Sequence, residues 1–221
     1  MKEDYSTELF RRIDEKKQKR ILEMAGDEFA REGYSGANTN KIAEKIGISV
    51  GSLYKYFRTK ENLFLATVHK GRRDLEKVFD TVTGIDGGLF EKIDALIGII
   101  QDYSRNHPQI TKLYNELTSE GNVDLARKLS AELEAPAANY YRQLITDAQQ
   151  AGEINEDTPP EILAFFMDNL FLTLQFSYAG IYYQERMRIF LGDRYADRDT
   201  LVRTSLCEFI RAALGGDKWT A

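Results

Sequence analysis

Apolar residues recur along the chain at intervals of three and four, which is the spacing of one face of an α-helix. The first run starts after Asp14, a residue that can cap a helix, and stops at Gly33. Further caps are available at Asn38 or Thr39 and at Ser49, with Gly47 between them. The first four helices are therefore predicted near residues 14–33, 39–46, 49–56 and 60–82.

The same periodicity continues to the end of the chain, and no alternating run typical of a strand occurs. Pro136 predicts a kink or break within one long helix. Thr158 and Glu161, with Pro159 at the first helical position, predict a capping box. The remaining helices are predicted near 89–106, 110–120, 125–148, 159–191 and 199–214, which gives an all-α protein of about nine helices.

Gly84, Gly87 and Gly88 form a glycine-rich joint that predicts a domain boundary. We expect a first helical domain in residues 1–60, a connecting helix in 61–84, and a second helical domain in 85–221.

The composition excludes disordered, collagen-like and low-complexity classes, since 43% of the 221 residues are hydrophobic and 29% are charged. The single Cys207 cannot form an internal disulfide, and the first residues are charged where a secretory signal would be apolar. The segment 162–183 carries Asp168 and several polar residues, so it is interpreted as buried in protein rather than in a membrane. A cytoplasmic protein is expected.

Charge is unevenly distributed along the chain. The net charge is -5, yet residues 1–72 carry 15 Lys and Arg against 11 Asp and Glu. Within 39–60 five basic residues face only Glu44: Lys41, Lys45, Lys55, Arg58 and Lys60. This stretch is typical either of a nucleic-acid surface or of a solvated face, and charge alone does not separate the two.

The segment from Thr39 to Tyr56 has the spacing of a helix-turn-helix. Two crossing helices need a small residue at their closest approach, which Ala43 supplies, and a free backbone at the turn, which Gly47 supplies. The apolar positions that face the preceding helix are filled by Ile42, Ile46, Ile48 and Leu53.

This geometry makes the second short helix the one that enters the major groove of DNA. Its outward residues, together with its cap, are Ser49, Val50, Gly51, Ser52, Tyr54 and Lys55. Thr39, Tyr56 and Lys60 lie at helix ends, where phosphates are commonly bound. For Tyr56 a place in the aromatic core is the alternative.

Residues 14–66, and above all 39–43, 47–57 and 60–64, resemble the DNA-binding domain of tetracycline-repressor (TetR) type regulators. The resemblance implies a homodimer on a palindromic operator in double-stranded DNA. It also implies a C-terminal helical domain that binds a small molecule and releases the DNA. A repressor is therefore predicted, and its nine DNA-binding residues are those named above.

The second domain offers aromatic and polar residues suited to a small hydrophobic or aromatic ligand. The candidates are Tyr103, Tyr114, Tyr141, Phe166, Asp168, Asn169 and Tyr178. Asp168 and Asn169 could instead cap a neighbouring helix or bond across a dimer. The apolar helix from Pro159, paired with the helix 201–214, is the candidate dimer interface, and a large monomeric core is its alternative.

An enzymatic or protein-interaction role for the C-terminal domain is the alternative function. His69 and His107 are isolated in sequence, and Cys207 lies on an apolar stripe. The sequence contains no phosphate loop, paired-Cys metal spacing or nucleophile elbow. We therefore expect no catalytic residues, no metal and no cofactor.

Overall fold

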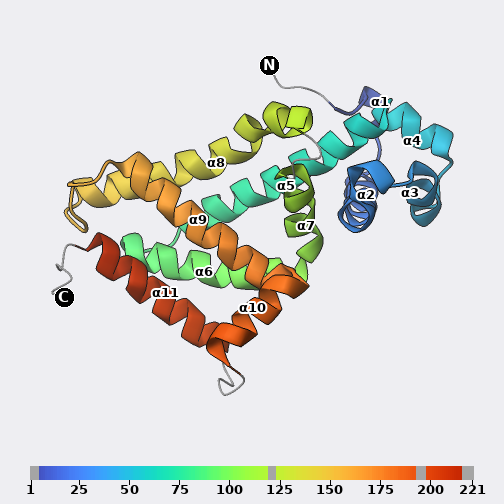
Figure 1. Cartoon of the computed structure of the whole chain (residues 1–221). Helices are drawn as coiled ribbons and strands as arrows, with labels where there is room; N and C mark the ends of the chain where they lie inside the picture. The colour runs from blue at the N-terminus through green and yellow to red at the C-terminus, as the bar shows by residue number, and fades with distance from the viewer. Residues whose placement is uncertain (1–4, 119–122, 193–197, 216–221) are drawn as a thin grey trace. The chain divides into compact units, whose positions relative to one another are not determined.

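The computed structural model describes residues 5–118, 123–192 and 198–215, and every regular element in them is a helix (Figure 1). The all-α prediction is confirmed, with eleven helices in the described residues where about nine were expected. Their bounds are α1 Glu8–Arg11, α2 Glu15–Gly36, α3 Thr39–Ile46, α4 Val50–Phe57, α5 Lys60–Thr83, α6 Leu89–Asn106, α7 Pro108–Thr118, α8 Val123–Gln150, α9 Pro160–Ala179, α10 Ile181–Leu191 and α11 Arg198–Leu214.

Two predictions about the helix after residue 159 are wrong. The single helix expected to reach residue 191 is two helices, because Gly180 adopts an extended conformation (φ -109°, ψ 133°) between α9 and α10. An apolar run does not reveal such a break, although glycine is a poor helix former. The capping box is also absent, since Pro159 occupies the cap position and makes no side-chain cap hydrogen bond.

The backbone packs into two compact units. The N-terminal unit comprises residues 1–75 and 109–126, and the C-terminal unit comprises 76–108 and 127–221. Helix α5 contributes residues to both units. The expected boundaries at residues 60 and 84 stay predictions.

The core of the N-terminal unit forms around the apolar stripe of α2. Ile21 and Phe29 on this stripe are fully buried. Helices α3 and α4 contribute Ile42 and Leu53, and α5 contributes Phe64, whose ring meets that of Phe29 edge-on with centroids 5.0 Å apart. The two short helices are thereby held against longer ones, which matters because an isolated eight-residue helix is not stable in water.

The C-terminal unit packs α6 against α9 and α11. Helix α6 buries Ile93, Leu96 and Ile97 with at most 1% of each exposed, and α9 buries Phe171 to the same degree. Two ion pairs join α6 to α11, Asp94 with Arg203 and Arg105 with Asp199.

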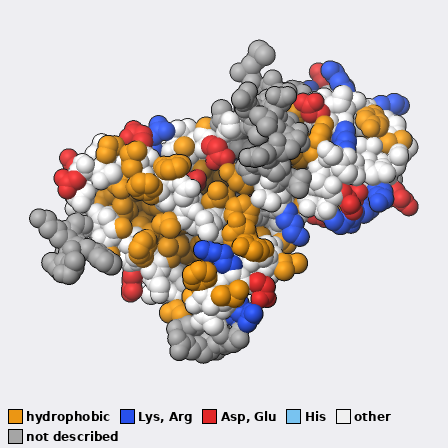
Figure 2. Space-filling view, in the orientation of Figure 1, with side chains coloured by type: hydrophobic (Ala, Val, Ile, Leu, Met, Phe, Trp, Pro, Cys, Tyr) orange, Lys and Arg blue, Asp and Glu red, His pale blue; other side chains and the backbone are white. Residues whose placement is uncertain are grey.

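Hydrophobic side chains remain exposed on the C-terminal unit, and Figure 2 shows them gathered on the face turned to the viewer. They lie on α9, α10 and α11: Ile162, Phe165, Phe166, Ile181, Tyr182, Ile189, Phe190, Leu201 and Phe209. By length and composition α9 is also the one described helix that could cross a membrane, a test that core helices of soluble proteins pass as well. One third of its most apolar stretch is buried within the chain.

Candidate DNA-binding surface

The turn between α3 and α4 has the backbone that its sequence predicts. Gly47 adopts the left-handed conformation (φ 80°, ψ 36°), and its N–H donates to the carbonyls of Ala43 and Glu44. Ser49 caps α4, because its side chain accepts a hydrogen bond from the N–H of Ser52 at 3.1 Å. Asn38 rather than Thr39 caps α3. The local chemistry of these residues therefore sets the angle at which α4 leaves the turn.

Helix α4 separates its residues sharply into an inner and an outer face. Leu53 and Phe57 are 1% exposed. Gly51, Tyr54 and Lys55 are exposed, and Tyr54 is 40% exposed. Val50 and Ser52 are partly exposed beside them. The predicted outward residues thus form one surface of small, hydroxyl-bearing and basic side chains.

A contact between two hydroxyl groups links the start of α3 to the outer face of α4. The Thr39 hydroxyl lies 3.1 Å from the Tyr54 hydroxyl, and either can donate. Both residues were predicted to contact DNA, one at the phosphates and one in the groove. The structure brings the two hydroxyls together, and because one donates to the other, one proton of the pair is left for a further acceptor.

The five basic residues of the segment 39–60 do not contribute equally to this surface. Lys45 donates to the Glu28 carboxylate at 3.0 Å, and Lys60 donates to the Ser35 carbonyl at 3.0 Å. The Lys60 ammonium also lies 5.2 Å from the centre of the Tyr34 ring. Lys41, Lys55 and Arg58 are exposed, and within the described residues no carboxylate pairs with them. The uncompensated charge near α4 is therefore carried by these last three side chains.

Glu28 is a buried carboxylate at the centre of this unit. Its side chain is fully buried and pairs with Lys45 of α3 and Arg31 of α2. Burial acts to raise the pKa of Glu28, but the hydrogen bond from Lys45 and the charges of Lys45 and Arg31 outweigh burial and lower this pKa. The ion pair thus fixes α3 to α2 while it removes Lys45 from the charge available to DNA.

Tyr56 occupies the aromatic core, which was the alternative considered for it. The residue is 9% exposed, and its ring lies 5.8 Å from that of Phe10 and 6.5 Å from that of Phe57. A contact between its hydroxyl and a phosphate stays a prediction.

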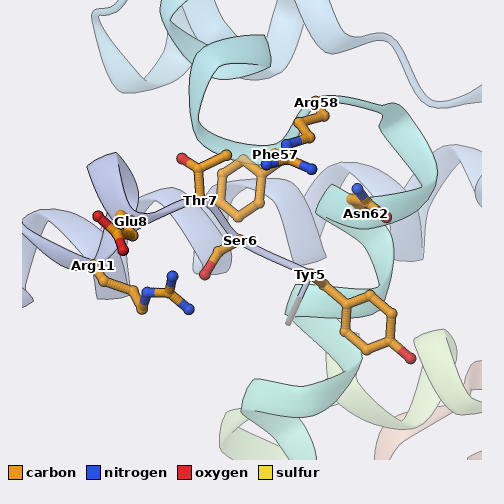
Figure 3. Close-up of a pocket in the computed structure, with 8 residues that line it drawn as sticks. All are labelled: Tyr5, Ser6, Thr7, Glu8, Arg11, Phe57, Arg58 and Asn62. Atoms are coloured by element: carbon orange, nitrogen blue, oxygen red, sulfur yellow. The ribbon is translucent and has the colours of Figure 1, made fainter. Parts of the chain in front are cut away.

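A hollow beside the end of α4 was not predicted from the sequence (Figure 3). Its walls come from the segment before α2 and from the corner between α4 and α5: Tyr5, Ser6, Thr7, Glu8, Arg11, Phe57, Arg58 and Asn62. Arg58 at this corner has a positive φ of 62°, which is costly for a residue with a side chain. No periodicity in so short a segment could have indicated that it folds onto α4.

The aromatic ligand candidates Tyr141 and Tyr178 are interior residues of the C-terminal unit. Tyr141 is 3% exposed, and its ring lies 5.6 Å from that of Phe171. Tyr178 is 6% exposed, and its hydroxyl accepts a hydrogen bond from Gln101 at 2.8 Å. Burial, followed by the charge of Glu134, raises the pKa of Asp168 to about 6.

The remaining ligand candidates do not join that interior. Phe166 is 57% exposed, and the exposed Asn169 donates to the carbonyl of Phe165 within its own helix at 2.7 Å. Tyr103 stacks on His107 with ring centres 4.4 Å apart, and Tyr114 belongs to the N-terminal unit. The predicted set is thus dispersed, because sequence spacing alone does not reveal which face of a helix is covered.

The part of the chain that the structure describes holds no group of three His, Cys, Asp or Glu residues that could bind a metal ion. Cys207 is half-buried, with its sulfur 3.6 Å from the Phe90 carbonyl, and burial raises the pKa of its thiol.

Comparison with known proteins identifies the N-terminal region. Residues 21–67 match the model of "Bacterial regulatory proteins, tetR family". The HTH-type transcriptional regulator YhgD of Bacillus subtilis is 24% identical over 75% of this chain and 85% of its own length. The HTH-type transcriptional repressor Rv1474c of Mycobacterium tuberculosis is 27% identical over 69% of this chain and 76% of its own length.

The fold also resembles that of solved transcriptional regulators. The crystal structure of the transcriptional regulator FadR from Bacillus subtilis superimposes with a TM-score of 0.67 at 19% identity, covering 87% of this chain and 96% of that one. The proteins matched here are named as regulators or repressors, which argues against the enzymatic alternative. Residues 21–67 thus form a helix-turn-helix domain of the tetR family, and these findings make the chain a DNA-binding transcriptional regulator similar to those of that family.

Proposed function

We propose that the protein represses transcription as a homodimer that binds a palindromic operator through two copies of α4. Val50, Gly51, Ser52, Tyr54 and Lys55 read bases in the major groove. Thr39, Ser49, Tyr56 and Lys60 bind the phosphate backbone. The observation that supports this assignment is the outer face of α4, where small and polar residues surround Lys55, a lysine that no carboxylate of the described residues pairs with.

The proposed dimer is formed by the exposed apolar residues of α9 and α11. Phe165, Phe166 and Phe209 are 63%, 57% and 59% exposed in the single chain. Exposed apolar patches of this kind are typical of protein interfaces. A two-fold axis would give the two recognition helices the separation of about 34 Å that successive major grooves require.

The proposed effector is a small hydrophobic or aromatic molecule bound by the C-terminal unit. FadR of Bacillus subtilis, a structural relative, is described in complex with stearoyl-CoA. We propose a ligand with an apolar body, with Tyr141 and Tyr178 as wall residues and Asp168 as a polar contact. Its binding would shift α5, so that the distance between the two copies of α4 no longer matches the spacing of the operator half-sites. As a regulator of transcription, the protein would act in the cytoplasm.

The assignment can be tested with DNA selected from a random duplex pool by the purified protein. In a fluorescence anisotropy titration, we expect Lys55→Ala to weaken binding of the selected duplex about 10-fold or more and to relax its base preference. Lys92→Ala on α6 changes the same net charge outside the N-terminal unit and should leave the affinity unchanged. Equal affinity of all three proteins would refute the assignment.

A further inference from the structure

The last turn of α4 is completed by a residue from the beginning of the chain. A helix ends with four carbonyls that lack partners within the helix. Thr7 supplies two of the missing donors: its hydroxyl binds the Lys55 carbonyl at 2.9 Å, and its N–H binds the Tyr56 carbonyl at 2.8 Å. The N–H groups of Arg58 and Thr59 supply the other two, at 2.8 and 2.7 Å. The four acceptors are Tyr54, Lys55, Tyr56 and Phe57.

Two aromatic side chains hold Thr7 in this position. Phe10 on α1 is 4% exposed, and its ring lies 4.6 Å from that of Phe57 at the end of α4. Tyr5 is 9% exposed, and its ring meets that of His69 on α5 edge-on at 4.8 Å. The segment 5–12 is therefore packed at both ends and hydrogen-bonded in the middle. Figure 3 shows its side chains around the corner that follows α4.

The orientation of α4 depends on such outside contacts. The helix has eight residues and a length of about 12 Å, too short to hold its shape alone. Its start is fixed by Gly47 and Ser49, as described above. Its end is followed by Arg58, whose φ of 62° matches the left-handed conformation that commonly closes a helix but whose ψ of -46° does not. Within residues 5–118, 123–192 and 198–215, the segment 5–12 is the part outside the helix-turn-helix that caps this end.

We propose that Thr7 and Phe10 are positioning residues that brace the recognition helix, so that the DNA-binding element of this protein begins at Tyr5. The brace lies outside residues 21–67, the region that matches the family model. Thr7 acts through the carbonyls of α4 and touches no base. The proposal rests on the proposed function only for its consequence in DNA binding, since the bracing contacts lie within the protein itself.

A direct role in binding phosphate is the competing explanation for this segment, because Arg11 at the end of α1 and the next residue, Arg12, are exposed. Arg12 pairs with Glu8 at 3.1 Å. The two explanations differ in ionic strength dependence. A lost phosphate contact reduces the slope of log affinity against log salt concentration by about one, whereas a displaced α4 lowers affinity at every salt concentration.

The first experiment measures the brace without DNA. Hydrogen exchange by mass spectrometry compares the wild type with Thr7→Val, which lacks the hydroxyl donor, and with Thr7→Ser, which keeps it. We expect the amides of 50–59 to exchange about 3- to 10-fold faster in Thr7→Val, the loss expected for one hydrogen bond. Thr7→Ser should match the wild type, and α2 should be unchanged in both. Equal exchange in all three proteins would overturn the proposal.

The second experiment measures the consequence for the selected duplex. Thr7→Val should bind it about 3- to 10-fold more weakly at each salt concentration with the same salt slope, and Thr7→Ser should restore the affinity. Phe10→Ala should have a larger effect than Leu9→Ala, since Leu9 is 48% exposed on the same helix. A reduced salt slope in Thr7→Val would mean that Arg11 or Arg12 loses a phosphate contact when the segment shifts, and it would overturn the brace in favour of that direct role.

These two experiments distinguish a failure of the proposed function from a failure of the proposed brace. If the wild type selects no duplex, the proposed function fails, while hydrogen exchange still decides whether Thr7 braces α4. If exchange at α4 increases in Thr7→Val without any loss of DNA affinity, the positioning role is overturned even though the contact stabilises the helix.

Discussion

Helix α4 exposes a polar and basic surface to solvent, whereas helix α9 exposes an apolar one. Around α4 the Thr39 and Tyr54 hydroxyls meet, Lys45 meets Glu28, and Thr7 caps the end, whereas Lys55 pairs with no carboxylate of the described residues. Helix α9 instead exposes Phe165 and Phe166. The surface of α4 needs no further protein partner, and it carries excess positive charge. The surface of α9 leaves apolar area in water, which is unfavourable until another surface covers it.

The difference indicates how the two regions depend on their surroundings. The N-terminal unit should fold from its own contacts and need only DNA to complete its function. The C-terminal unit should need a second copy of the chain. Four changes test this contrast, beginning with the largest expected effect.

A charge placed on the apolar face of α9 should have the largest effect. Phe166→Glu would set a carboxylate in the proposed interface, where an unpaired charge is costly to bury. We expect a dimer in the wild type and a monomer in the variant by analytical ultracentrifugation. Operator affinity should fall on the order of 100-fold with the loss of bivalent binding. Leu9→Glu adds the same charge at an exposed position of α1 and should remain dimeric; a dimeric Phe166→Glu would contradict the proposed interface.

Removal of the buried charge of Glu28 should have the second largest effect. Glu28→Gln loses charged hydrogen bonds to Lys45 and Arg31, so the free energy of unfolding should fall by about 2 kcal/mol at pH 7. The lowered pKa means that this stabilisation is present above pH 4.5, the ordinary value for Glu, and is lost as the pH falls through the pKa of the folded state. Denaturant titrations should therefore converge for the two proteins once the pH lies below the pKa of Glu28 in the folded state. A constant difference across this range would argue against the ion pair.

A methyl group at Gly51 should separate stability from binding. A Cβ built at this position lies 3.8 Å from the Ser49 hydroxyl oxygen, an ordinary contact, so the protein has room for it. Because alanine favours helix more than glycine does, Gly51→Ala should be at least as stable as the wild type by thermal unfolding. Its affinity for the selected duplex should nevertheless fall several-fold if DNA approaches α4 at this point. Unchanged affinity would place Gly51 outside the interface.

Asp168 should give the smallest effect, and with the opposite dependence on pH. Its pKa is raised from 3.8 to about 6, so the folded state holds the proton more tightly than the unfolded chain. The resulting stabilisation is full below pH 3.8 and is lost as the pH rises through about 6. Asp168→Asn should be more stable than the wild type at pH 7.5, by about 1 kcal/mol once partial exposure to water is allowed for, and equal near pH 4. A variant less stable at pH 7.5 would indicate that the charge has a partner.

The sequence predicts best those features that depend on neighbours in the chain. Gly47, Ser49 and Asn38 set the turn and the caps of α3 and α4 through contacts within a few residues, and all three act as such caps or turns in the structure. The inner and outer faces of α4 also follow from spacing alone. These local signals were sufficient to predict the helix-turn-helix.

Features that depend on distant contacts were not predictable in the same way. Thr7 binds carbonyls 48 and 49 residues away in sequence, and Lys60 turns to the Ser35 carbonyl. The seven ligand candidates share aromatic or polar chemistry, yet they differ in burial because their helices cover different faces. Residue type indicated what each side chain could do, and packing decided whether it was in a position to do so.

The most direct test of the account is hydrogen exchange of the whole protein with and without its selected duplex, read by mass spectrometry. We predict that protection concentrates in residues 39–60, which carry α3, α4 and the start of α5, and extends to the segment 5–12 that caps α4. Protection confined to other parts of the chain, with 39–60 exchanging as in the free protein, would contradict the assignment of α4 as the recognition helix.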